Sequence, residues 1–63
     1  MSANLSPLLL RPEEAADYLG IGRTKVYELI RSGALRSVRI GSLRRIPATA
    51  LTDFVAQLEE EAA

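Results

Sequence analysis

The stretch from residue 23 to residue 32 concentrates side chains that suit hydrogen bonding to a polyanion. On a helical wheel Val26, Leu29 and Ile30 fall on one apolar face. Arginine can bond guanine bidentately, glutamate can accept from cytosine, and a threonine methyl can touch thymine. The N-terminus of such a helix also offers free backbone N–H groups to a phosphate. The side chains of the opposite face, with lysine at its edge, are Arg23, Thr24, Lys25, Tyr27, Glu28 and Arg31.

An ordinary solvated helix face would also be polar, with Glu28 pairing Arg31 at a spacing of three residues. The distribution of charge along the chain favours recognition of a nucleic acid over an ordinary solvated helix. The formal net charge is zero, yet residues 23–45 hold seven basic residues against Glu28 alone. Residues 1–22 carry a net −2 and residues 46–63 a net −4. Because binding responds to the local field rather than to the total charge, the +6 middle segment indicates a nucleic-acid partner.

A second basic element follows in a segment with the period of a strand. Val38 and Ile40 alternate with an arginine, Gly41-Ser42 marks a turn, and two further arginines precede Ile46. A short basic ribbon of this kind suits contact with the DNA backbone or minor groove. The alternative interpretation is that these arginines protect an edge strand, since charged side chains on edge strands discourage aggregation. The candidate contacts of this wing are Arg39, Ser42, Arg44 and Arg45.

Two registers are possible for the hairpin. We expect a three-residue loop, 41–43, because it pairs Val38 with Ile46 and Arg39 with Arg45. Apolar side chains then share one face and arginines the other. A two-residue loop would turn Ile46 away from the core.

The elements that position these side chains follow from capping and turn residues. Pro12–Leu19 is the first expected helix, with proline at its first position and acids in its first turn. Gly20-Ile21-Gly22 forms a short turn before the Arg23–Ser32 helix, which is typical of a helix-turn-helix. Tyr18 and Phe54 are expected in the core.

The remaining segments complete an α+β, mostly helical, winged helix-turn-helix. Residues 1–7 are expected to be a flexible arm, and residues 8–10 an apolar strand-like or linker piece that can close over the core. The last helix, about Ala48 to Glu60, has the strongest amphipathic pattern, at Leu51, Phe54, Val55 and Leu58. The domain then spans residues 8–60, and 61–63 form a frayed tail. No second apolar face is expected, so we predict a monomer that assembles only along DNA.

Composition excludes several classes of function. With no Cys and no His among 63 residues, the chain has no thiolate or imidazole metal ligands and no histidine-based catalytic nucleophile. A domain of this size also has little core to spare for an enclosed active site. We therefore expect no enzyme activity, no catalytic residue, no metal and no cofactor. The N-terminal apolar run is too short for a signal or a membrane span, which predicts a cytoplasmic protein with no membrane partner.

Residues 10–35, 37–41 and 44–47 together resemble the excisionase-type, MerR-like winged-helix DNA-binding domains. The matching motifs include Glu-Ala-Ala, Gly-Ile-Gly-Arg, Val-Tyr and Arg-Ser-Gly in the family's order and spacing. The resemblance implies that the second helix enters the major groove of double-stranded DNA and that the wing reaches the adjacent minor groove or backbone. Gly22 stands where the family has a capping Ser, Arg11 where it has Thr, and Ser42 where it has a basic wing-tip residue.

No long coiled-coil helix and no effector domain are expected in these 63 residues, and a domain of this size resembles small phage and mobile-element excisionases. These are also called recombination directionality factors. The resemblance implies that copies bind neighbouring sites, bend attachment DNA and direct a tyrosine integrase towards excision. A small phage or mobile-element transcriptional regulator is the first alternative, and a protein-interaction module is the second.

Overall fold

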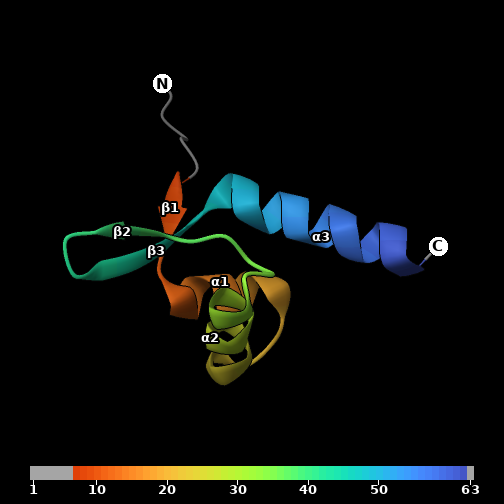
Figure 1. Ribbon diagram of the computed structural model, residues 1–63, viewed down its shortest axis with the longest axis horizontal. Helices are drawn as coiled ribbons and strands as arrows, with labels where there is room; N and C mark the ends of the chain where they lie inside the picture. The colour runs from red at the N-terminus through yellow and green to blue at the C-terminus, as the bar shows by residue number, and fades with distance from the viewer. Residues whose placement is uncertain (1–6, 63) are drawn as a thin grey trace.

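Residues 7–62 are described by a computed structural model, in which helices outweigh strands. Figure 1 shows the hairpin at one end of the molecule and the last helix extending towards the other. This arrangement confirms the predicted α+β, mostly helical architecture, which is compatible with a winged helix-turn-helix. The expected flexible arm, apart from Pro7, lies outside the described residues. The elements in chain order are β1 (Leu9–Leu10), α1 (Pro12–Leu19), α2 (Arg23–Ser32), β2 (Val38–Ile40), β3 (Leu43–Pro47) and α3 (Ala48–Ala62).

Helices α1 and α2 have the bounds expected from the sequence, and a backbone cap fixes the turn between them. Gly20 adopts φ 70°, and its N–H donates to the Asp17 carbonyl. The Ile21 N–H donates to the Ala16 carbonyl at 3.0 Å. This pair of bonds is a Schellman motif, and Ile21 packs against the core beside it. The turn therefore sets the angle at which α2 leaves α1.

Neither of these helices begins with a side-chain acceptor. The Arg11 backbone N–H instead donates to Glu14 Oε1 at 2.9 Å, and Pro12 occupies the first helical position. Gly22 precedes α2 with extended backbone angles and no side chain to accept a bond. The first N–H groups of α2 therefore have no capping side chain over them.

The core is small, and it joins both helices of the turn to the sheet and to α3. Val26, Leu35 and Ile46 are its largest fully buried side chains. In residues 7–62 no polar or charged side chain is buried. The Leu35 backbone N–H donates to the Leu29 carbonyl, so the chain folds back into the core directly after α2. The buried apolar residues are Leu10, Ala15, Ala16, Val26, Leu35, Ile46, Ala50 and Leu51.

Strand β3 is the centre of an antiparallel sheet with the order β1-β3-β2. Leu10 pairs with Ile46 and Leu9 with Pro47, while the Ala48 N–H donates to the Leu8 carbonyl at 2.9 Å. Of the two alternatives for residues 8–10, a strand or a linker, the structure thus has a short strand at Leu9–Leu10. Because Ile46 is buried beside Leu10, β3 anchors the hairpin to the core at one end and leaves the rest of it projecting.

The predicted hairpin register is wrong. Val38 pairs with Arg45 and Arg39 with Arg44, across a two-residue loop at 41–42. Gly41 has φ 61°, whereas Ser42 does not have a positive φ, which is the pattern of a tight type II′ hairpin turn.

The predicted register requires the apolar residues of both strands to share one buried face, and they do not. Ile46 is fully buried, but Val38 is 40% exposed. The ribbon extends beyond the core, so both of its faces meet solvent and the alternation in β2 does not identify a buried side. Ile46 and Arg44 lie on one face, and Val38 and Arg45 lie on the other.

Two predictions about apolar side chains near α3 also need correction. Tyr18 is 71% exposed and is not a core aromatic, whereas Phe54 is half-buried against the core as expected. Val55 and Leu58 are 40% and 48% exposed, because α3 continues past the body of the domain (Figure 1). The prediction that no second apolar face remains is therefore wrong. Helix α3 ends at Ala62, two residues later than expected.

Candidate nucleic-acid interface

The outward face of α2 presents the six side chains expected from the sequence. Val26 is fully buried and Leu29 and Ile30 are half-buried, which fixes the rotation of the helix about its axis. Arg31 lies near the C-terminal end of this face and Tyr27 one turn before it. The exposed residues are Arg23, Thr24, Lys25, Tyr27, Glu28 and Arg31.

Two of the basic residues on α2 lie beside carboxylates. Arg23 Nη1 is 3.8 Å from Glu13 Oε2, and Lys25 Nζ is 3.6 Å from Glu28 Oε1. The pairing of Glu28 with Arg31, which the alternative interpretation of a solvated helix required, is absent from the ion pairs of residues 7–62. All four paired side chains are more than half exposed, so these contacts are weak and a stronger anion can replace them.

Four arginines of α2 and the wing have no carboxylate partner within 4 Å in residues 7–62. Arg36, on the loop before the wing, differs from them because it bonds Asp53 at 2.9 Å. The free guanidiniums leave a positive field over the two elements that the sequence singled out. They are Arg31, Arg39, Arg44 and Arg45.

A shallow hollow of about 490 Å³ joins α2 to the wing. Tyr27, Ile30 and Arg31 line it from α2, and Ser37 and Arg44 line it from the hairpin side. Arg44 Nη1 donates to Ser37 Oγ at 3.0 Å, which holds that guanidinium at the edge of the hollow. The structure therefore brings the two predicted basic elements to one concave surface.

Ser37 was missed by the sequence analysis, although it positions a predicted contact residue. Its hydroxyl accepts from Arg44, seven residues later in the chain. Only the correct hairpin register would have suggested this pairing, because that register places Arg44 on the face of the ribbon that adjoins α2. Its neighbour in the hollow, Ile30, was predicted only as part of the apolar face of α2.

Arg39 and Arg44 lie directly opposite each other on the hairpin and share a face with Ile46. Like charges placed opposite each other destabilise a strand pair by about 0.2–1 kcal/mol in the absence of a counter-ion. A polyanion bound to this face removes that penalty. The pair is thus an arrangement that favours a phosphate-bearing partner.

The structure does not bring Arg45 together with those two arginines. Arg45 belongs to the opposite face of the ribbon, where it pairs with Val38, and its Nη1 donates to the Arg44 carbonyl at 2.8 Å. Ser42 is exposed at the tip of the loop. The predicted wing residues are therefore divided, with Arg39 and Arg44 facing α2 and Arg45 facing away.

Other kinds of site find no support in the described part of the chain. Residues 7–62 hold no cluster of three or more acidic side chains placed to bind a metal ion. No helix among them is both long and apolar enough to cross a membrane.

Comparison with known proteins agrees with the geometry of α1, α2 and the wing. Residues 9–59 match the family model described as "Helix-turn-helix domain". The chain is 61% identical over 51 residues to "Probable excisionase" of Saccharopolyspora erythraea, and 43% identical over 51 residues to "Excisionase" of Streptomyces ambofaciens. The chain belongs to the excisionase-type helix-turn-helix family.

The two matches differ in how much of each relative they cover. Each covers 81% of this chain, but the first spans 52% of the Saccharopolyspora protein and the second 82% of the Streptomyces protein. The chain thus spans about half the length of the first relative. No solved structure is significantly similar to the chain. Membership of this helix-turn-helix family agrees with the expectation that the chain is not an enzyme.

Proposed function

We propose that the chain binds duplex DNA with α2 in the major groove and the wing against the adjacent backbone or minor groove. Helix-turn-helix domains place their second helix in the major groove. The side chains that recognise bases or phosphates there are Arg23, Thr24, Lys25, Tyr27, Glu28 and Arg31. From the wing, Arg39, Ser42 and Arg44 contact the backbone, and Arg45 adds charge from the far face.

The observation that supports this proposal most strongly is the hollow shared by α2 and the wing. Arg31 and Arg44 line it from separate elements, and neither has a carboxylate partner among the described residues. A convex duplex fits a concave basic surface, whereas a solvated face would have its arginines paired or dispersed. Glu28 is the one acidic residue on α2, and we assign it to base recognition because its carboxylate can accept a hydrogen bond from the amino group of cytosine.

We further propose that the protein acts as an excisionase, or recombination directionality factor. The names of its two relatives support this role. Copies bound at neighbouring sites bend the attachment DNA and direct a tyrosine integrase towards excision, while strand exchange stays with the integrase. Binding and bending of the attachment DNA take place in the cytoplasm of the host cell, where that DNA lies.

Salt dependence of binding tests the DNA interface. Each phosphate contact adds about −0.9 to the slope of log K against log salt. Contacts from Arg31, Arg39 and Arg44 alone give a slope of about −2.7, and the two paired cations of α2 extend it to about −4.5. A flat response on duplex DNA would contradict the proposal and favour a protein-interaction module.

Excision itself is tested by reconstitution with a tyrosine integrase of the same mobile element and its paired attachment sites. Recombination of those sites should require this protein. The double variant Arg31→Ala with Arg44→Ala should abolish its effect while keeping the helical circular dichroism of the wild type. Equal excision with and without the protein would refute the directional role.

A further inference from the structure

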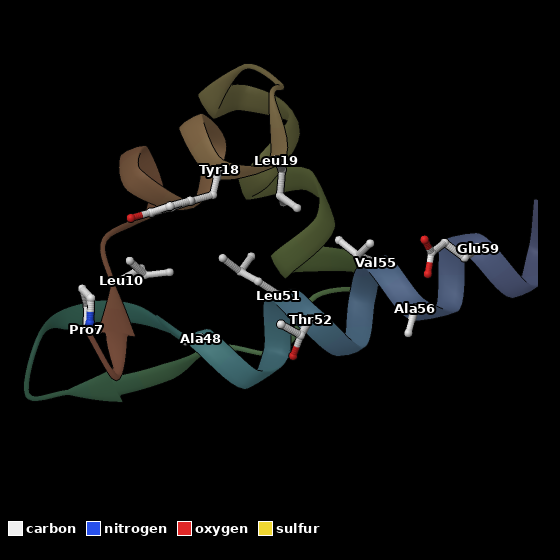
Figure 2. Close-up of a pocket in the computed structure, with 10 residues that line it drawn as sticks. All are labelled: Pro7, Leu10, Tyr18, Leu19, Ala48, Leu51, Thr52, Val55, Ala56 and Glu59. Carbon is white, nitrogen blue, oxygen red and sulfur yellow. The ribbon is translucent and has the colours of Figure 1, made fainter. Parts of the chain in front are cut away.

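An apolar groove of about 460 Å³ lies between α1 and the segment of α3 from Ala48 to Glu59. Figure 2 shows Leu10, Leu19, Leu51 and Val55 pointing into the space between the two helices, with Tyr18 extended along its edge. The proposed DNA interface does not use any of these side chains. An apolar groove of this kind, open to solvent, marks a binding surface.

Among residues 7–62, the charged side chains that line the groove and the depression beside it are acidic. Glu59 lines the groove from α3, and Glu14 and Asp17 lie with Tyr18 around the adjoining depression. Arg11 Nη2 lies 3.7 Å from Glu14 Oε2, so Asp17 and Glu59 are the carboxylates here without a basic partner among residues 7–62. The fitting occupant is therefore an apolar surface accompanied by positive charge.

The wing of this same chain carries such a surface. Val38, Ile40 and Leu43 are 40%, 54% and 51% exposed, and the register places them on one face of the ribbon with Arg45. We call these four residues the outer wing face. It lies opposite the face of Arg39 and Arg44, so DNA binding leaves it uncovered. Three exposed apolar side chains side by side are unexplained by the fold of one copy.

These two surfaces do not meet within one molecule, because none of the four residues of the outer wing face lines the groove. The hairpin projects from one end of the domain and α3 extends towards the other, along a longest dimension of 38 Å (Figure 1). We propose that the outer wing face of one copy docks in the α1–α3 groove of a second copy. Apolar side chains then fill the groove, and Arg45 lies near the Glu59 carboxylate.

The contact joins two different surfaces, so it is heterologous rather than symmetric. A heterologous pair leaves one free groove and one free wing, to which further copies add unless the array closes into a ring. Each copy in the array keeps Arg31, Arg39 and Arg44 available. The use of this array to align copies on DNA rests on the proposed function, whereas the protein–protein contact does not.

Mixing two blocked variants provides the test. The wing variant carries Ile40→Thr and Leu43→Thr, and the groove variant carries Val55→Glu. All three side chains are already 40% or more exposed, so the fold should be retained. Gln57→Glu on α3, outside the groove lining, is the control for the added charge. Sedimentation equilibrium is measured for each protein at concentrations up to about 1 mM, where weak contacts become populated.

The wild type and Gln57→Glu should associate increasingly with concentration. Each blocked variant alone should associate at least about tenfold more weakly, because burial of one or two apolar side chains is lost. An equimolar mixture of the two variants should form dimers and no larger species, since one intact wing meets one intact groove. All four proteins should bind a single-site duplex with equal affinity, which separates this contact from DNA binding.

Three results would overturn the proposal. One is a wild type that stays monomeric up to that concentration, which would favour a basic segment of another protein as the occupant. Another is association of either blocked variant as strongly as the wild type. The third is a mixture that remains monomeric under conditions where the wild type associates.

Discussion

Replacing Arg44 and Arg45 separately tests whether the two faces of the wing differ in DNA binding. Arg44 lies in the hollow beside Arg31, whereas Arg45 is on the opposite face of the ribbon. A hydrogen bond to a charged partner is worth about 1.5–3 kcal/mol. Arg44→Ala should therefore weaken binding to any duplex about 10- to 150-fold.

The same change at Arg45 removes only an attraction at longer range. Across about 10 Å of water two unit charges interact by about 0.4 kcal/mol, and salt near 0.1 M screens much of that. Arg45→Ala should thus weaken binding about twofold or less. The observed register, which places Arg39 and Arg45 on opposite faces, corrects the expectation from the three-residue loop that they share the binding face.

Fluorescence anisotropy with a short labelled duplex of arbitrary sequence measures both variants, because phosphate contacts do not depend on sequence. Repeating the titrations at several salt concentrations gives the slopes. Arg44→Ala should reduce the magnitude of the slope by about 0.9, and Arg45→Ala should leave it nearly unchanged. Equal losses of affinity and slope for the two variants would refute the assignment of the faces.

Further predictions concern stability and base preference. Ile46→Ala should cost about 2–5 kcal/mol in urea unfolding, because it empties a fully buried site, and a cost below that of the exposed Ile40→Ala would contradict the core assignment. Gly20→Ala should lower stability by about 1–2 kcal/mol through its φ of 70°, and unchanged melting would show that the left-handed turn is not required. Gly22→Ser should raise stability by a few tenths of a kcal/mol in the same assay, because a Cβ added there meets nothing within 4 Å and the serine hydroxyl can cap α2. A decrease in stability would argue against the extended backbone at this position. Glu28→Ala should reduce discrimination between sites by about 1–3 kcal/mol in competition titrations, and unaltered preference would remove it from base recognition.

The sequence specified the helix-turn-helix because the decisive signals were local. Pro12 fixes the start of α1, and Gly20 and Gly33 end the two helices with left-handed backbone angles. Val26 and its half-buried neighbours set the outward face of α2 through helical periodicity alone. Interactions between residues a few positions apart were therefore sufficient to predict the ends of α1 and α2 and the outward face of α2.

The parts that were predicted wrongly depended on contacts between distant segments. The hairpin register was inferred from Val38, whose apolar side chain faces solvent because the ribbon extends beyond the core. Tyr18 was expected inside for its chemical type, but the turn geometry leaves it at the edge of a groove formed with α3. Helical periodicity identified an apolar stripe along α3. It could not show that the rest of the domain covers only the first turns of this helix, around Leu51.

Backbone amide chemical-shift mapping during titration with duplex DNA tests the central claim most directly, because it locates the contact surface residue by residue. The largest perturbations should fall on residues 23–31 of α2 and on residues 37–44 of the wing, with little change over residues 50–62. Perturbations concentrated on α3 and the acidic side of α1, or dispersed evenly over the domain, would contradict a single basic surface formed by α2 and the wing.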